Sequence, residues 1–554
     1  WEGRWALGAA AAAAVGAGLA AWASGHAPLA FDALRARGAV LRADAGAAPC
    51  DAHPASAAPG YASRREDLPE YTAADVSTHS EPKSGVWVSY GQGVYDITEF
   101  AKGHPGGSEK IMLAAGGALE PFWALFAEPH GKLATLQLLE TLRIGNLRQD
   151  AAAAAAIADI DDPYAEDPPR HPALVVQSPK PFNAESPAAT LADARITPIP
   201  LFFIRHHMPV PLVDEKDYVL SVGDTRAGAS SGTLELSLDD LKKFPKVEVE
   251  ATMQCTGNRR SSANEVKPTK GINWGVGAIS NAVWGGARLR DVLEAAGIDV
   301  EALATGEGEA HVRFEGMDLD PSGDPYGSSV PARRALRDGS AVLAYEMNGE
   351  PMPRDHGAPV RVIVPGVTGA RSVKWVASLE VADEESESFW QRQDYKIYPP
   401  NTSFDNLAQG AKHAIPIQDT PLQSAITSPV PGATVSPRDG EVACAGYAFA
   451  GGGRGILRVD VSFDGENWTQ AELDRPQKSA GRTYAWTLWK ASVPIPESAQ
   501  RAAGGEATPL RLRVRALDDE HNTQPSTAAD VWNMRGLLTN SWHSIDLVLP
   551  GKGG

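Results

Sequence analysis

Cysteine is scarce in this chain. Its 554 residues include only three cysteines, Cys50, Cys255 and Cys444, and no common spacing relates them. Such a set provides neither a disulfide framework nor a zinc site, because both need cysteines in suitably spaced pairs. The compartment in which the protein works therefore need not be oxidising.

Motifs for nucleotide binding are also absent. No Gly-x-Gly-x-x-Gly follows a predicted strand and no Walker lysine motif occurs, so nothing supports binding of nicotinamide, flavin or nucleoside triphosphates.

A Gly-x-Ser-x-Gly run at residues 228–232 matches a hydrolase nucleophile elbow in its letters. Residues 233–238 alternate like a strand, where the elbow needs a helix, so we expect a hairpin loop.

Basic residues are fewer than acidic ones, 51 against 69, and the formal net charge is -18. This excess argues against nucleic acid as a partner, and it suits either a cationic protein partner or a merely solvated acidic surface. Hydrophobic residues make up 43% and charged residues 22% of the chain, as in ordinary soluble proteins. The length is too great for one core and predicts roughly three or four domains.

Residues 1–66 lack the patterns of a fold. Residues 5–24 carry no charge and are mostly Ala and Gly, which bury too little apolar surface for firm membrane insertion. Arg35, Arg37 and Arg42 come next, followed by a stretch rich in Pro, Ala and Ser. We expect a targeting and linker segment, with a membrane anchor as the alternative.

Residues 68–148 contain two histidines in settings suited to a haem. A β-rich segment leads to His104, which a Pro-Gly-Gly turn follows, and His130 comes after a helix-like stretch at 108–115 and an apolar run at 122–126. Two imidazoles on opposite walls of an apolar pocket supply the axial ligands of six-coordinate haem iron.

The motifs around His104 resemble cytochrome b5. They are His-Pro-Gly-Gly at 104–107, Tyr-Asp-Ile-Thr-Glu-Phe at 95–100 and Leu-Ala-Ala-Gly-Gly at 113–117. The resemblance implies a b-type haem with His104 and His130 as axial ligands, although one residue more than in related oxidase haem domains stands before His130. Residues 149–168, rich in Ala and then acidic, predict a flexible tether.

The rest of the chain predicts two further domains. Residues 169–410 contain many short β-like runs between Gly and Pro, with a few helical stretches such as 289–296, which predicts an α+β fold. In residues 418–547, apolar and polar residues alternate over 457–463 and again over 510–516. Short alternating strands at regular spacing predict an antiparallel β-sandwich.

Cys255 is the most informative single residue. Arg259 and Arg260 follow it closely and supply positive potential that favours a thiolate, while Gly257 and Asn258 bend the chain around the sulfur. Such a setting suits a soft-metal ligand or a nucleophile. The alternative is a buried cysteine that acts as a small hydrophobic residue.

The central domain also presents Arg, His or Lys from turns rich in Gly or Pro. This geometry suits an anionic phosphate and the polar edges of a ring. Taken singly, each such residue is more often a surface charge or a satisfied core histidine. The turns lie at residues 202–211, 318–327, 355–361 and 369–375.

Together with Cys255, these blocks closely resemble the sulfite oxidase family over residues 68–547, through stretches such as 344–349 and 351–357. The resemblance implies that Cys255 is the thiolate ligand of molybdenum in a pterin cofactor, for which a soft sulfur ligand is suitable. His206 stands where relatives commonly have Asn, and Ser372 where some have His. The residues implied to hold the pterin are Phe202, Phe203, Ile204, Arg205, His206, Asp318, His356, Arg361, Ser372, Val373 and Lys374.

The same resemblance implies the substrate site. Arg205, Arg260 and Arg535 match the family's anion-binding arginines, whose guanidinium groups suit a small oxyanion. Trp274 and Tyr326 are implied to line the site, with Tyr326 donating a hydrogen bond or a proton. The resemblance further implies sulfite oxidation, electron transfer through the haem to cytochrome c, an Ig-like C-terminal domain that forms a homodimer, and the mitochondrial intermembrane space.

Two alternatives stay open. Assimilatory nitrate reductase uses both cofactors, but its haem domain follows the molybdenum domain and a flavin module comes last, whereas here the haem domain comes first and we expect no flavin module. The second alternative is a non-catalytic haem protein or electron carrier with a degenerate scaffold. Cys255, Arg205, Arg260 and Tyr326 are all present, which argues against it.

Overall fold

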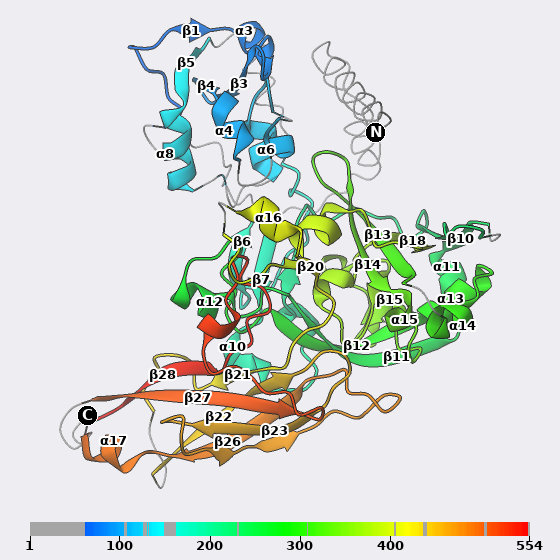
Figure 1. The fold of residues 1–554 in the computed structure, drawn as a ribbon, viewed down its shortest axis with the longest axis vertical. Helices are drawn as coiled ribbons and strands as arrows, with labels where there is room; N and C mark the ends of the chain where they lie inside the picture. Colours follow the sequence, from blue (N-terminus) through cyan, green and yellow to red (C-terminus); the bar gives the residue numbers. More distant parts are fainter. Residues whose placement is uncertain are drawn as a thin grey trace, which may run out of the picture. The chain divides into compact units, whose positions relative to one another are not determined.

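The computed structural model describes residues 61–104, 108–112, 114–125, 130, 132–148, 162–229, 232–306, 309–403, 406–435, 440–502 and 507–551. The expected targeting segment at 1–60, the tether at 149–161 and residues 105–107 after His104 lie outside these ranges. The chain divides into two compact units, with the main boundary between Pro163 and Tyr164 (Figure 1). No described helix is long and apolar enough to cross a bilayer.

The first unit is built on one five-stranded sheet of order β1-β5-β4-β3-β2. Val86 and Val88 of β3 and Tyr95 of β4 are fully buried and form its core with Leu119 and Leu139. The strands are β1 (Glu70–Tyr71), β2 (Ser80–Glu81), β3 (Gly85–Tyr90), β4 (Gly93–Asp96) and β5 (Arg143–Leu147). The helices are α3 (Ala73–Ser77), α4 (Thr98–Lys102), α5 (Ser108–Met112), α6 (Glu120–Leu125) and α8 (Leu133–Thr141).

This unit begins slightly earlier than the sequence predicts. Ala62 is buried, its amide donates to Glu140 Oε1 at 2.8 Å, and its carbonyl accepts from the Gln92 amide at 2.7 Å. The structure therefore places residues 61–67 with the haem-type domain, whereas the sequence interpretation assigned most of them to a linker. A lone buried alanine in a polar stretch leaves no periodic pattern that could have revealed this.

The central part of the second unit contains two five-stranded sheets. One is mixed, of order β10-β9-β18-β13-β14, and in it only the β18–β9 pair is parallel. The other has the order β11-β12-β15-β16, with β17 paired to β15. Their strands are β9 (Val219–Asp224), β10 (Leu234–Ser237), β11 (Lys246–Gln254), β12 (Ile279–Arg288), β13 (His311–Leu319), β14 (Pro325–Pro331), β15 (Val342–Met347), β16 (Glu350–Pro351), β17 (Arg361–Ile363) and β18 (Val376–Ala382).

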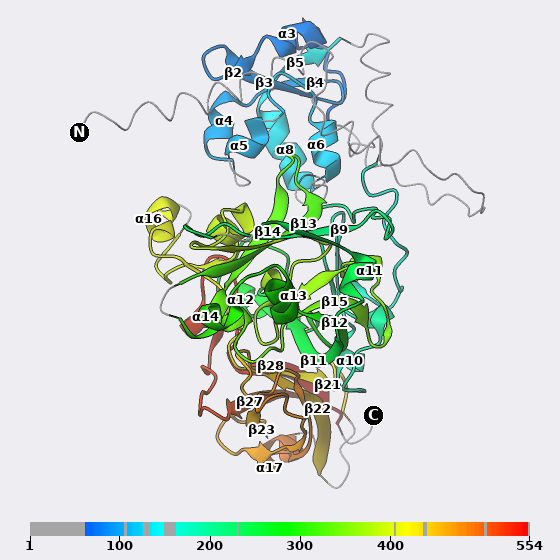
Figure 2. The same ribbon diagram turned by 90° about the vertical axis from the view of Figure 1, so that its right-hand side faces the viewer.

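Helices and a small sheet complete this α+β region. α13 (Leu289–Ala295) packs against β12 (Figure 2). α10 (Ala188–Leu191), α11 (Leu238–Leu241), α12 (Arg260–Val266), α14 (Val300–Thr305), α15 (Ala332–Ala335) and α16 (Leu407–Ala411) are the other helices, and β6 (Val175–Pro179), β7 (Phe182–Glu185) and β8 (Ile204–Arg205) form a three-stranded sheet. The predicted helix at 289–296 is thus confirmed. The run at 228–232 joins the antiparallel strands β9 and β10, as expected of a hairpin; residues 230 and 231 are outside the described part.

The C-terminal part of the second unit is a sandwich of two antiparallel four-stranded sheets, β21-β22-β26-β25 and β24-β23-β27-β28. Their inner faces share one hydrophobic core that includes Val459, Val461, Leu512 and Val514, which confirms the alternating pattern from Val459 onward. Leu457 is 45% exposed, because the register shifts between Ile456 and Arg458. The strands are β21 (Gln423–Ser428), β22 (Glu441–Phe449), β23 (Ile456–Ser462), β24 (Thr469–Gln470), β25 (Glu472–Asp474), β26 (Thr487–Pro494), β27 (Thr508–Asp518) and β28 (His543–Leu549). This is the architecture of the predicted Ig-like domain.

Candidate active site

In the first unit, His104 follows α4 and His130 precedes α8. Their ring centroids are 6.5 Å apart and the ring planes differ by only 6°. Two imidazoles that bind one metal through nitrogens, at about 2 Å per bond, need their ring centres roughly 6 Å apart. The donor set therefore fits the two axial ligands of a haem iron. Trp123 lies parallel to His130, at 5.1 Å between centroids and 12° between planes.

In the second unit, a cavity gathers most of the predicted cofactor residues. Its lining comes from the ends of several strands and from short turns between them, spread over residues 202–395. From the predicted set it includes Phe202, Phe203, Arg205, His206, Cys255, Asp318, Tyr326, His356, Arg361, Ser372 and Lys374. Ile204, Val373, Trp274, Arg260 and Arg535 lie outside that lining.

Cys255 sits at the cavity wall directly after β11 and is buried. Its amide donates to the Ala278 carbonyl at 2.9 Å, and its own carbonyl accepts from the Asn258 amide at 3.0 Å. The Asn258 side chain bonds Tyr447 of the sandwich at 3.1 Å. The loop that presents the thiol is therefore held on both sides. Cys444, by contrast, lies within β22, where burial raises the pKa of its thiol to about 12.

Arg260 lies behind this loop, in a space that only glycines leave open. A Cβ on Gly257 would lie 2.8 Å from Arg260 Nη2, and a Cβ on Gly271, whose φ is +132°, would lie 2.7 Å from Arg260 Cζ. The Arg260 side chain donates to the carbonyls of Arg535 at 2.8 Å and Ile272 at 2.5 Å. Burial lowers the pKa of Arg260 to about 10, and the charge of Cys255 opposes that shift. A buried guanidinium so close to the sulfur makes this end of the cavity electropositive.

Arg535 reaches the same region from the C-terminal part. Its Nη2 pairs with Asp394 Oδ1 at 2.5 Å, and Asp394 ends the π-helical turn Trp390–Asp394. Burial opposes ionisation, but Asp394 more than offsets it and raises the pKa of Arg535. Arg535 and Arg205 both lower the pKa of Arg260. Arg205 lines the cavity with Cys255, and Arg260 lies behind the Cys255 loop in contact with the Arg535 backbone.

The tyrosine that shares this electropositive end is Tyr395, which the sequence interpretation missed. Its hydroxyl lies 2.8 Å from His207 Nε2. Burial raises the pKa of Tyr395 to about 12, and among smaller causes Arg205 lowers it and Cys255 raises it. Tyr326 also lines the cavity, but its hydroxyl donates to the Ala370 carbonyl at 2.9 Å. We therefore propose Tyr395, and not the predicted Tyr326, as the tyrosine of the substrate site.

This assignment predicts different outcomes for two matched variants. Tyr395→Phe should lower kcat/KM for the substrate anion by about ten- to a hundredfold, because it removes a hydroxyl beside the reacting centre. Tyr326→Phe removes a bond to a backbone carbonyl and should mainly cost stability, about 1 kcal/mol. Steady-state kinetics and thermal unfolding of both proteins would measure this; a larger kinetic loss in Tyr326→Phe would reverse the assignment.

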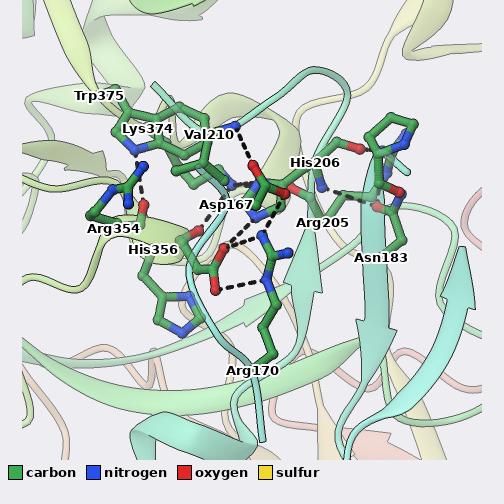
Figure 3. Close-up of polar contacts among 12 residues, drawn as sticks. Asp167, Arg170, Asn183, Arg205, His206, Val210, Arg354, His356, Lys374 and Trp375 are labelled. Atoms are coloured by element: carbon green, nitrogen blue, oxygen red, sulfur yellow. Dashed lines mark hydrogen bonds and ion pairs between the residues drawn. The ribbon is translucent and has the colours of Figure 1, made fainter. Parts of the chain in front are cut away.

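Another group of lining residues has the features of a pterin and phosphate site. Arg361 donates only to carbonyls, those of His356 at 2.9 Å and Ser372 at 3.1 Å, and burial lowers its pKa to about 9. Lys374 and His206 lie at the same wall, and the Lys374 ammonium bonds His206 Nδ1 (Figure 3). Burial also lowers the pKa of His356 to about 3, so this ring is neutral at physiological pH.

Two buried polar atoms test whether an anionic, polar cofactor fits here. Among the described residues, Arg361 Nε and Thr256 Oγ1 are buried and have no hydrogen-bond partner. Buried donors without partners cost free energy, and both residues line the cavity. A ligand with phosphate and ring acceptors would satisfy them, with Cys255 as a soft ligand for its metal. The residues present therefore fit a molybdenum-pterin cofactor.

Several lining residues were not assigned a role from the sequence. Trp375 and Asp355 lie in turns that the sequence analysis singled out, whereas Met253, Thr256 and Tyr395 had no motif that marked them. Met253 precedes Cys255 by two positions on β11, so strand alternation could have indicated that both face the same side. The full set comprises His207, Met253, Thr256, Asp355, Gly369, Ala370, Trp375 and Tyr395.

Comparisons with known proteins agree with both sites. Family models match a cytochrome b5-like heme/steroid binding domain at residues 72–148, an oxidoreductase molybdopterin binding domain at 207–390 and a Mo-co oxidoreductase dimerisation domain at 414–549. Sulfite oxidase of Gallus gallus is 50% identical over 478 residues, which cover 86% of this chain and 99% of that protein. The chain belongs to the sulfite oxidase family.

Other members and neighbours extend this result. The mitochondrial sulfite oxidase of Homo sapiens is 48% identical over 477 residues, covering 86% of this chain and 84% of that protein. Among solved structures, the sulfane dehydrogenase SoxCD from Paracoccus pantotrophus has a TM-score of 0.53 and 26% identity, and covers 70% of this chain and 89% of that chain. The predicted fold class and the predicted cofactors of a sulfite oxidase, molybdopterin and haem b, are confirmed.

Proposed function

We propose that this protein oxidises sulfite to sulfate at a molybdenum centre beside Cys255. Sulfite and water yield sulfate, two protons and two electrons. The carrying observation is that Arg205 lines one cavity with Cys255, while Arg260, five residues after Cys255, donates to the Arg535 carbonyl at 2.8 Å, in a chain of the sulfite oxidase family. When bound, the molybdenum-pterin cofactor supplies the two-electron acceptor and the oxo group for this chemistry.

The protein's own residues supply anion binding and orientation. Sulfite is a dianion, and guanidinium groups bind such oxyanions through paired N–H donors. Asp394 holds Arg535 and the backbone carbonyls of Ile272 and Arg535 hold Arg260, so the charges are positioned before the substrate arrives. Preorganised charges need little reorganisation on binding, which favours both affinity and rate.

A haem held by His104 and His130 would accept the electrons one at a time. The parallel His104 and His130 rings support a six-coordinate haem, which is suited to electron transfer because it leaves no open position for a substrate. We propose cytochrome c as the final acceptor, since the net charge of -18 would attract a basic protein. Residues 149–168 would serve as the tether that lets the haem domain approach both partners.

The dimerisation domain match at residues 414–549 supports a homodimer formed through the sandwich. The human relative is named as mitochondrial, and we propose the mitochondrial intermembrane space for this protein, where cytochrome c would be available.

Nitrate reduction remains the second candidate because it uses the same two cofactors, but the haem domain precedes the molybdopterin domain here.

A substrate comparison tests the proposal. Purified protein should reduce ferricytochrome c when sulfite is added, with two equivalents reduced per sulfite consumed, and should show no nitrate consumption with reduced electron donors. Molybdenum and iron, measured by elemental analysis, should each approach one per chain. Nitrate turnover without sulfite turnover would favour the reductase instead, and iron without molybdenum would indicate a haem carrier.

A further inference from the structure

A buried chain of polar contacts connects the start of the second unit to the cofactor cavity (Figure 3). It begins at Arg170, whose Nε donates to Asp355 Oδ2 at 3.1 Å and whose Nη2 donates to Asp355 Oδ1 at 2.8 Å. Asp355 Oδ1 also lies 2.9 Å from His206 Nε2, and His206 Nδ1 lies 2.6 Å from Lys374 Nζ. Four side chains thus join residues that are up to 204 positions apart, from 170 to 374.

Arg170 is fixed more firmly than a surface ion pair. Its side chain is only 12% exposed, and its Nη2 also donates to Asp167 Oδ2 at 2.9 Å. Its guanidinium lies over the Phe182 ring, 4.2 Å from the centroid. Bidentate, partly buried pairs of this kind hold their geometry well. Burial alone would raise the pKa of Asp355. The contacts from His206 and Arg170 outweigh burial and hold this pKa below its usual value, so the carboxylate stays ionised.

The ionised Asp355 decides which nitrogen of His206 holds the proton. A carboxylate can only accept, so His206 Nε2 must be the donor, and in a neutral ring Nδ1 is then an acceptor. Burial lowers the pKa of His206 to about 3, which keeps the ring neutral. The Lys374 ammonium can therefore donate to Nδ1. With the opposite tautomer, two donors would face each other across 2.6 Å.

Lys374 has all three of its N–H donors directed by these contacts. Besides His206 Nδ1, it donates to the carbonyls of Arg205 and Asp355, each at 3.1 Å. Three acceptors match the three donors of a protonated amine. Burial and the charge of Arg361 lower the pKa of Lys374 well below its usual value, and the charges of Asp318 and Asp355 oppose this. The three contacts hold Lys374 Nζ at one place on the cavity wall.

We infer that Arg170 is a positioning residue of the cofactor site. By holding Asp355 in place, it orients His206 with Nε2 toward the carboxylate and so fixes Lys374 Nζ, which contacts His206 Nδ1, at the wall where the anionic pterin cofactor binds. The inference rests on the cofactor assignment of the proposed function. The inference adds Arg170, which lies outside the cavity lining and acts on Lys374 through Asp355 and His206.

The test measures retention of molybdenum in the purified full-length holoenzyme. Release of molybdenum is followed at a temperature below the unfolding transition, with the haem absorbance as an internal measure of intact protein. Arg170→Met should release molybdenum about tenfold faster than the unaltered protein, as expected for loss of a charge-assisted contact. Arg170→Lys keeps the charge but not the two-pronged geometry, so it should release molybdenum about threefold faster than the unaltered protein. This variant replaces Arg170→Met in the test if Arg170→Met does not fold.

Arg226→Met is the matched control. Arg226 forms an equivalent two-pronged pair with Asp224, through Nε at 2.9 Å and Nη2 at 2.6 Å, and does not line the cavity. Its loss should leave the release rate within about 1.5-fold of the unaltered value, since surface pairs contribute little. A similar acceleration in both variants would mean that general destabilisation explains the effect, and would overturn the inference.

A double-mutant cycle separates the relay from a merely structural role. In His206→Asn, the amide oxygen takes the place of Nδ1 as acceptor for Lys374 without help from Asp355. In that background Arg170→Met should change the release rate by less than about threefold, because coupled residues give non-additive effects. If Arg170→Met accelerated molybdenum release equally in the unaltered protein and in His206→Asn, the relay through His206 would be overturned. If the unaltered protein held no molybdenum, the cofactor assignment itself would fail, and this result differs from either result of the cycle.

Discussion

Cys255→Ser should abolish sulfite-dependent reduction of cytochrome c, with kcat falling by roughly 10³-fold or more. The thiol sits at the cavity wall on a loop that the Ala278 carbonyl and the Asn258 amide hold in place. Serine keeps the size and the loop contacts but replaces a soft sulfur with a hard oxygen, which alters the metal's electronic properties. Steady-state assays with sulfite measure the loss.

The haem gives an internal control for this variant. His104 and His130 belong to the first compact unit, whereas Cys255 belongs to the second. The haem spectrum and its reduction by a chemical reductant should therefore be unchanged in Cys255→Ser. Sulfite turnover that persists at more than a few per cent would contradict the role of Cys255.

Arg260→Gln should give the second largest effect, a fall in kcat/KM for sulfite of about a thousandfold, equivalent to about 4 kcal/mol. The guanidinium is packed between two glycines, with its donors fixed by the carbonyls of Arg535 and Ile272. Glutamine has no charge and cannot fill this space with the same donors. The loss should appear mainly in KM if Arg260 binds sulfite and the transition state equally, and in kcat if it acts on the transition state alone.

A matched variant makes the Arg260 prediction specific. Arg259 is the neighbouring arginine and is fully buried, but its Nη1 donates to the Ser541 carbonyl at 2.6 Å, on the side of the C-terminal part. Arg259→Gln should therefore lower the free energy of unfolding more than the sulfite affinity per molybdenum. A larger KM increase in Arg259→Gln than in Arg260→Gln would contradict the assignment of the anion site.

Local patterns predicted much of the fold. Alternation over 457–463 predicted β23, whose Val459 and Val461 face the sandwich core, because side chains of a strand alternate between two faces. The residues after Gly228 predicted a hairpin by the same argument. Residues 61–66 were assigned to a linker, because the contacts of Ala62 with the rest of the unit are hydrogen bonds to the distant Gln92 backbone and Glu140 side chain. Such contacts leave no local pattern.

The site was predicted only in part, for a related reason. Cys255 and Arg260 lie on one loop, so their proximity follows from the sequence. Tyr395 directly follows the π-helical turn Trp390–Asp394, 140 positions after Cys255, and no spacing rule brings the two together. The contact of Arg170 with Asp355 spans 185 positions and depends on how the strands are arranged. These residues became visible only once the tertiary packing was known.

Molybdenum K-edge X-ray absorption on the purified protein tests the central claim most directly. The spectrum of the unaltered protein is compared with that of Cys255→Ser, at equal molybdenum content. We expect the variant to show one sulfur fewer at the metal and one additional oxygen or nitrogen, because we propose the Cys255 thiolate as the ligand from the polypeptide. An identical number of sulfur neighbours in the two proteins would contradict it.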